Sequence, residues 1–212
     1  MISVSPNATF NFEDANIPNE FIVIVEATDG NVVYPKTSEP DATVTIKITN
    51  ENDNAPIFAG TPITAKVCEN VDIGESVLTV TATDADNDKL TFSIKTKLIP
   101  FKINSSTGLI ETTGIIDRET SDRYELTVCV TDGKTIVSTT VIITVIDKND
   151  NDPVIPNVEK TFPEDTQNGT ILVMLGLIAT DADIGSFGEL SFAIDNGDTS
   201  LFEIPPVSFL FT

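Results

Sequence analysis

Hydrophobic and polar residues alternate over several short runs of the chain. These runs cover residues 44–48, 78–82, 90–94, 101–103, 124–130 and 141–145. Because successive side chains of a β-strand point to opposite faces, such alternation predicts strands with one buried face. Val, Ile and Thr are frequent in these runs, and no long segment has the helical period. The pattern therefore predicts an all-β sandwich fold.

Two motifs recur at the same spacing. The letters NDNAP at 52–56 return as NDNDP at 149–153, and ATDAD at 82–86 returns at 179–183, in both cases 97 residues later. A repeat of about 100 residues is the size of a small β-sandwich. We expect three units: residues 1–54 with the later strands of one, 55–151 as a complete one, and 152–212 with the first half of another. The two incomplete ends should be less stable than the middle.

The charge balance narrows the range of functions. The 33 acidic residues outnumber 12 basic ones and give a formal net charge of −21. Such a chain repels nucleic acid and anionic lipid, so cations are its natural partners. Histidine is absent, which removes the Ser-His-Asp and Cys-His nucleophile systems. We expect no enzyme, although a paired-carboxylate glycosidase using Asp117 and Glu119 is the alternative of that class.

The acids gather at the ends of predicted strands. Asp84, Asp86 and Asp88 place oxygens at every second residue, as calcium loops do. An EF-hand does not fit, because Lys89 would stand at the glycine position and no flanking helices are predicted. Asp and Asn also favour turns, which explains a single cluster well. Recurrence favours calcium, since like charges crowded together repel unless a cation lies between them.

Five ordered motifs resemble the cadherin extracellular repeat and cover the whole chain. They are CEN at 68–70, ATDAD at 82–86, DRE at 117–119, VTDG at 130–133 and DKNDNDP at 147–153. The resemblance implies tandem Greek-key, seven-stranded β-sandwiches, with the first and third repeats incomplete. It also implies Ca²⁺ at each junction, held by the end of one repeat, the linker and the start of the next.

The ligands below are those that the resemblance implies. For the first junction they are Glu13, Glu51, Asn52, Asp53, Asn54, Asp84, Asp86 and Asp132. For the second they are Glu69, Asp117, Glu119, Asp147, Lys148, Asn149, Asp150, Asn151, Asp181 and Asp183. Glu51, Lys148 and Asn151 would act through main-chain carbonyls. Because the second set has more carboxylates, we expect two calcium-binding phases, with the tighter one at the second junction.

The implied function is calcium-dependent, homophilic cell adhesion at the plasma membrane. The partners would be other cadherin ectodomains, of the same or another kind, and contact with a membrane would need an anchor outside this fragment. The chain has no Trp, so the N-terminal tryptophan exchange of classical cadherins is excluded and a protocadherin-like or Fat-like protein fits better. A structural spacer without an adhesive contact is the alternative reading.

Three further features concern the cellular location of the chain, its membrane contact and its cysteines. Asn7, Asn104 and Asn168 each begin an N-glycosylation tripeptide, which favours an extracellular glycoprotein. The most apolar run, 171–179, is too short to span a membrane and predicts a buried strand. Cys68 and Cys129 can pair or stay free, because spacing does not determine connectivity. Alternation places Cys129 away from the core side of its strand.

Overall fold

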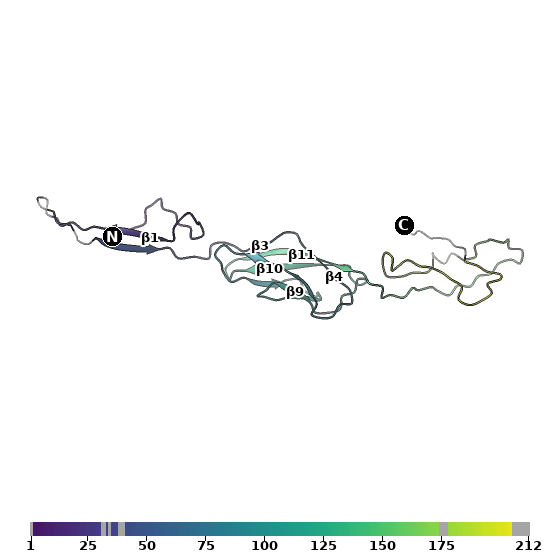
Figure 1. Cartoon of the computed structure of the whole chain (residues 1–212). Coiled ribbons are helices and arrows are strands. Elements are labelled where there is room, and N and C mark those ends of the chain that lie inside the picture. The colour runs from purple at the N-terminus through teal and green to yellow at the C-terminus, as the bar shows by residue number, and fades with distance from the viewer. Residues whose placement is uncertain (1, 31–32, 34, 38–40, 174–177, 205–212) are drawn as a thin grey trace.

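The computed structural model describes residues 2–30, 33, 35–37, 41–173 and 178–204. Figure 1 shows an elongated molecule with three parts arranged end to end. Every regular element of the described residues is a β-strand, which confirms the all-β prediction. No described helix is present that could cross a membrane.

The described residues of the first part contain one antiparallel pair of strands, β1 (Glu20–Val25) and β2 (Ala42–Lys47). Val23 lies opposite Val44 on one face of the pair, and both side chains are half-buried. The other face carries Ile22 and Ile24, whose exposed fractions are 66% and 68%. The two strands therefore bury apolar surface on one side only.

The central part is a two-layer sandwich of seven main strands, as predicted. One sheet has the order β4 (Ile63–Cys68), β11 (Ile136–Ile146), β10 (Arg123–Thr131) and β7 (Thr91–Ile94). The other has the order β5 (Ser76–Thr79), β9 (Leu109–Thr112) and β8 (Phe101–Ile103). A short pair, β3 (Ile57–Phe58) with β6 (Ala82–Thr83), adds to them. Among the described strands of the central part, only β4 and β11 pair in parallel.

The run predicted at 78–82 is divided between two strands, because the chain passes from one pairing partner to another. β5 ends at Thr79, and β6 begins at Ala82. Between them the N–H of Val80 donates to the carbonyl of Gly108 at 2.9 Å. Gly108 has φ +73°, and a Cβ there would lie 2.1 Å from the Val80 carbonyl oxygen. Only glycine fits this crossing of the two segments.

The hydrophobic core lies wholly within the central part of the described chain. It contains Val67, Val80, Phe92, Phe101, Ile110, Ile116, Leu126, Val128, Val130, Val141, Ile143 and Val145. Most of these residues come from the inward positions of the predicted alternating runs, since period-2 strands present every second residue to the facing sheet. The core therefore anchors the loops that carry acids at both ends of the central part.

The two cysteines differ from the prediction in one respect. Alternation predicts that Cys129 lies on the side away from the core, yet it is buried, with only 2% exposed. β10 lies between β7 and β11, so a small side chain is covered from both sides. Cys68 and Cys129 are free thiols. They lie opposite Ile146 and Ser138 of β11, which are far apart along that strand, so no disulfide can join them.

The strand predicted at 171–179 is not found in its described portion. Residues 174–177 lie outside the described residues, and the flanking residues are not strand. Ile171 is 69% exposed. The described bridge of this third part joins Val154 to Thr180. An apolar run forms a buried strand only where a neighbouring strand and a facing layer cover it, and the described residues here supply neither.

Candidate metal sites at the two junctions

The first junction is the linker 50–54 with the acids that meet it from both sides. One carboxylate oxygen each from Glu13, Asp53 and Asp86 lie within 4.8 Å of one another. They come from the first part, the linker and the central part. Asp86 also accepts hydrogen bonds from the N–H groups of Asp53 at 3.0 Å and Asn54 at 2.8 Å. The linker is thus fastened to the loop after β6.

That loop forms a second cluster from neighbouring residues. Oxygens of Asp84, Asp86 and Asp88 also lie within 4.8 Å of one another. The N–H of Asp86 donates to Asp84 Oδ1 at 2.9 Å, and Asn87 takes a positive φ of 60°. This curled backbone turns three alternating carboxylates inward. Asp88 was left out of the ligands that the family resemblance implied, although its i, i+2, i+4 spacing in the sequence pointed to it.

Several oxygens at the first junction are buried without a hydrogen-bond partner. They are Glu13 Oε1, Asn52 Oδ1, Asp84 Oδ2, Asp88 Oδ2 and Asp132 Oδ2. Leaving a buried acceptor unpaired costs about 1–3 kcal/mol, and more when it is charged. A hard divalent cation coordinates such oxygens directly, and Ca²⁺ takes six to eight of them. The donor set therefore fits calcium.

Asp132 reaches the first junction from the loop after β10. Its Oδ1 accepts the N–H groups of Lys134 at 2.7 Å and Thr135 at 2.5 Å. The hydrogen bond from Thr135 lowers the pKa of Asp132 below its usual value, against the opposing effect of burial. The Asn52 amide donates to the Asp132 carbonyl at 3.4 Å, which ties the linker to this loop. Glu51 lines a small cavity of about 210 Å³ beside the cluster.

The second junction is the linker 147–153 with the acids around it. Two carboxylate triads meet within 4.8 Å: Glu69 with Glu119 and Asp147, and Glu119 with Asp150 and Asp183. Glu119 belongs to both triads. Its pKa is raised by burial and by the negative charge of Glu69. The central part, the linker and the third part all contribute oxygens.

Glu69 organises this junction from inside the central part. Its side chain is fully buried, and it accepts the N–H of Arg118 at 2.8 Å and the N–H of Lys148 at 2.6 Å. These two hydrogen bonds hold the 117–119 loop and the linker against each other. The resemblance placed Glu69 at this junction, but not these two hydrogen bonds, whose partners lie 49 and 79 residues away along the chain.

The third part repeats the linker contacts of the first junction. Asp183 accepts the Asn151 side-chain amide at 2.8 Å, as Asp86 accepts that of Asn54 at 3.0 Å. Asp147 Oδ2 accepts the N–H of Ile184 at 2.9 Å. Burial alone would raise the pKa of Asp147, but the hydrogen bond from Ile184 and the nearby Arg118 hold it below its usual value.

Of the residues that the resemblance implies as side-chain ligands at the second junction, three lie outside the described carboxylate triads. Asp117 uses its oxygens to accept the Thr120 N–H at 3.2 Å and hydroxyl at 2.8 Å. Asp181 accepts the N–H of Asp183 at 2.9 Å and shapes that loop. Asn149 is exposed in the linker.

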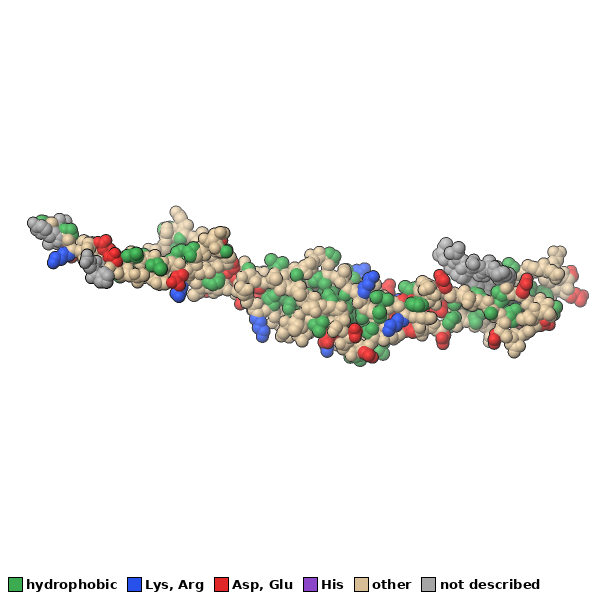
Figure 2. Space-filling view, in the orientation of Figure 1, with side chains coloured by type: hydrophobic (Ala, Val, Ile, Leu, Met, Phe, Trp, Pro, Cys, Tyr) green, Lys and Arg blue, Asp and Glu red, His purple; other side chains and the backbone are tan. Residues whose placement is uncertain are grey.

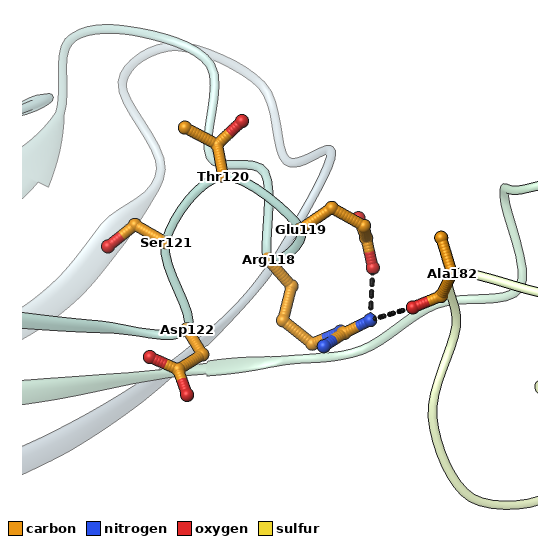
Figure 3. A pocket seen from close by; sticks show the side chains of 6 residues that line it. All are labelled: Arg118, Glu119, Thr120, Ser121, Asp122 and Ala182. Carbon is orange, nitrogen blue, oxygen red and sulfur yellow. Dashed lines mark hydrogen bonds and ion pairs between the residues drawn. The ribbon is translucent and has the colours of Figure 1, made fainter.

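Arg118 is a basic residue inside the second junction, and the ligands that the resemblance implies do not include it. Its side chain, 11% exposed, forms ion pairs with Asp147 and Glu119. It also donates to the carbonyl of Ala182 at 2.5 Å (Figure 3). Burial opposes its charge, but these two carboxylates raise the pKa of the guanidinium above its usual value. An open polar cleft of about 550 Å³ lies beside it.

Comparison with known proteins identifies a family. Residues 63–146 match the family model described as Cadherin domain. The Drosophila melanogaster protein "Protocadherin-like wing polarity protein stan" is 37% identical over 89% of the chain, and mouse "Protocadherin Fat 4" is 34% identical over 92%. The chain spans only 6% and 4% of these relatives.

Solved structures show the same likeness. The crystal structure of mouse Cadherin-23 EC22-24 superposes with a TM-score of 0.78 at 29% identity, covering 92% of this chain and 62% of that one. The protocadherin gammaB7 EC3-6 cis-dimer structure gives 0.73 at 25% identity, covering 95% and 54%.

Fold and comparisons together define a cadherin-type ectodomain segment. The chain belongs to the cadherin family, among relatives named as cadherins, protocadherins and Fat proteins. These relatives are not enzymes, which confirms the prediction that this chain is none and rejects the glycosidase alternative.

Proposed function

We propose that this chain serves calcium-dependent, homophilic cell adhesion as part of an ectodomain on the outer side of the plasma membrane. The units would be residues 1–54, 55–151 and 152–212, with calcium sites between them. One observation carries the proposal: at each junction, carboxylates from both neighbouring parts and the linker converge within 4.8 Å. Acids crowded in this way repel one another until a cation neutralises them.

The linker side chains prepare both sites in the same way. Asn54 and Asn151 each bond the carboxylate of the following part, so the linker lies against that part before any metal binds. Bound Ca²⁺ would supply positive charge and coordinate oxygens from both sides of each linker. The chain would then behave as a stiff rod able to present an adhesive surface. Figure 2 shows acidic side chains along this elongated shape and few basic ones.

The proposed partners are ectodomains of the same family, in homophilic or heterophilic contact. The spacer alternative keeps the calcium-bound rod and drops the adhesive contact. Beads coated with the chain, alone or within a longer ectodomain, separate the two: adhesion requires aggregation in millimolar Ca²⁺ that EDTA reverses. A rod that stiffens with calcium and never aggregates the beads supports the spacer.

Small-angle scattering and thermal unfolding test the calcium proposal itself. We expect millimolar Ca²⁺ to narrow the distribution of molecular dimensions and to raise the melting temperature, because a ligand that binds only the folded, bridged state stabilises that state. Mg²⁺ at the same concentration is the control, since it prefers stricter octahedral geometry and retains its waters. Identical curves in EDTA and Ca²⁺ would falsify the proposal.

The extracellular location has separate support from the three glycosylation tripeptides. Asn7, Asn104 and Asn168 all lie on exposed turns among the described residues. Asn104 accepts the N–H groups of Ser106 at 2.9 Å and Thr107 at 3.1 Å through its side-chain oxygen, and these bonds do not involve its amide nitrogen. Modification there would disturb no core contact.

A further inference from the structure

We propose that Arg118 is an internal cation that closes the second junction when calcium is scarce and must leave its carboxylates before calcium binds there. The proposal rests on the proposed calcium site, and it adds a residue whose charge opposes the metal. The guanidinium carries a permanent positive charge and a fixed fork of donors, so it can bridge several oxygens at once.

The contacts of Arg118 join the same three segments that the acidic triads join. Its Nε donates to Asp147 in the linker, and its Nη2 donates to Glu119 in the central part. The same Nη2 donates to the carbonyl of Ala182, which lies between two implied ligands of the third part. Figure 3 shows this guanidinium lying between Glu119 and Ala182. In this arrangement Arg118 holds the junction together without a metal.

The first junction provides an internal comparison. Glu13 meets Asp53 and Asp86 there, as Glu119 meets Asp150 and Asp183 at the second junction. The residue before Glu13 is Phe12, so no cation stands at the position of Arg118.

The two junctions differ in how many buried carboxylate oxygens lack a hydrogen-bond partner. At the first junction, carboxylate oxygens of Glu13, Asp84, Asp88 and Asp132 are buried without partners. At the second junction no described side-chain oxygen is in that condition. Lys134 does not replace the missing cation, because its ammonium group bonds the main-chain carbonyl of Asn52. Arg118 therefore bonds Glu119 at the second junction, whereas Glu13, the counterpart of Glu119 at the first junction, keeps a buried oxygen without a partner.

A guanidinium and a divalent cation cannot share these oxygens without strong repulsion. Two charges of the same sign about 4 Å apart near a protein surface repel each other. Arg118 borders the open cleft of about 550 Å³, which gives its side chain room to withdraw. The exposed carboxylate of Asp122 lines the same cleft and can receive the guanidinium.

Arg118→Met tests the proposal in the full chain, with Arg123→Met as the matched control. Arg123 forms a surface pair with Glu125 and is 51% exposed, so both variants lose one positive charge but only one changes the junction. By isothermal titration with Ca²⁺, we expect Arg118→Met to bind about three- to tenfold more tightly in the second-junction phase. Arg123→Met should bind as the unaltered protein does.

The calcium-free state gives the second readout. In EDTA we expect trypsin to cut after Lys148 about threefold or more faster in Arg118→Met, because proteolysis follows the population of the opened linker. Arg118→Lys keeps the positive charge. Its calcium affinity and its cleavage rate after Lys148 should therefore lie between those of Arg118→Met and those of the unaltered protein. The reciprocal change, Phe12→Arg, should weaken the first-junction phase by a similar factor.

The outcomes separate this proposal from the calcium proposal. If the unaltered protein binds no calcium, the proposed function fails, and the EDTA cleavage rates alone decide whether Arg118 bridges the junction. If it binds calcium and Arg118→Met binds no more tightly, Arg118 is not a competitor and the inference is overturned. Unchanged cleavage after Lys148 in EDTA overturns it equally.

Discussion

Exchange of Glu69 for Gln tests whether this buried carboxylate stabilises the central part even without calcium. Glu69 accepts two backbone N–H groups, from Arg118 at 2.8 Å and from Lys148 at 2.6 Å. Glutamine has nearly the same shape, but its amide nitrogen would face one of these donors. One charge-assisted hydrogen bond is lost and one N–H stays unsatisfied, at a cost of roughly 1.5–3 kcal/mol. Relief of the repulsion from Glu119 works in the opposite direction.

We therefore expect a net loss of about 2 kcal/mol in the free energy of unfolding in EDTA. For a domain of this size that lowers the melting temperature by about 10 °C. Circular dichroism against temperature, in EDTA and in Ca²⁺, measures both states. The loss in the free energy of unfolding should be larger in Ca²⁺, because the variant also lacks one negatively charged calcium ligand. Glu125→Gln, on the exposed face of β10, is the control. A variant that melts with the unaltered protein in EDTA would refute the reasoning.

Further predictions concern the same junctions. Asp150→Ala should remove the tighter calcium phase in a titration, and a retained tight phase would contradict the assignment. Gly188→Ala should weaken that phase too, because a Cβ there would lie 2.2 Å from the Asp183 carbonyl oxygen; equal affinity would show that the loop adapts. The free energy of unfolding in EDTA should fall as the pH drops below the ordinary pKa of aspartate. The lowered pKa of Asp147 favours the folded state only while its carboxylate is ionised. Asp147→Asn should make the free energy of unfolding less dependent on pH in this range. Secreted protein should lose the mass of one glycan with Asn104→Gln, and an unchanged mass would exclude that site.

Much of the fold could be predicted because strand signals are local. Alternation in the runs at 124–130 and 141–145 corresponds to β10 and β11. The run at 78–82 was harder, because the chain changes partners at Val80 and only the packing against Gly108 reveals it. The prediction for 171–179 failed in its described portion, since an apolar run becomes a strand only when other strands cover it.

For the junctions, the sequence alone determined which acids recur and in what order, because repeated motifs are visible without any folding. Only the tertiary structure decided the individual contacts among them. It showed that Glu69 accepts the N–H groups of Arg118 and Lys148, and it placed the Arg118 side chain among the acids of the second junction. Spacing along a chain does not encode such encounters, because they depend on how two packed sheets bring distant loops to one end of the sandwich.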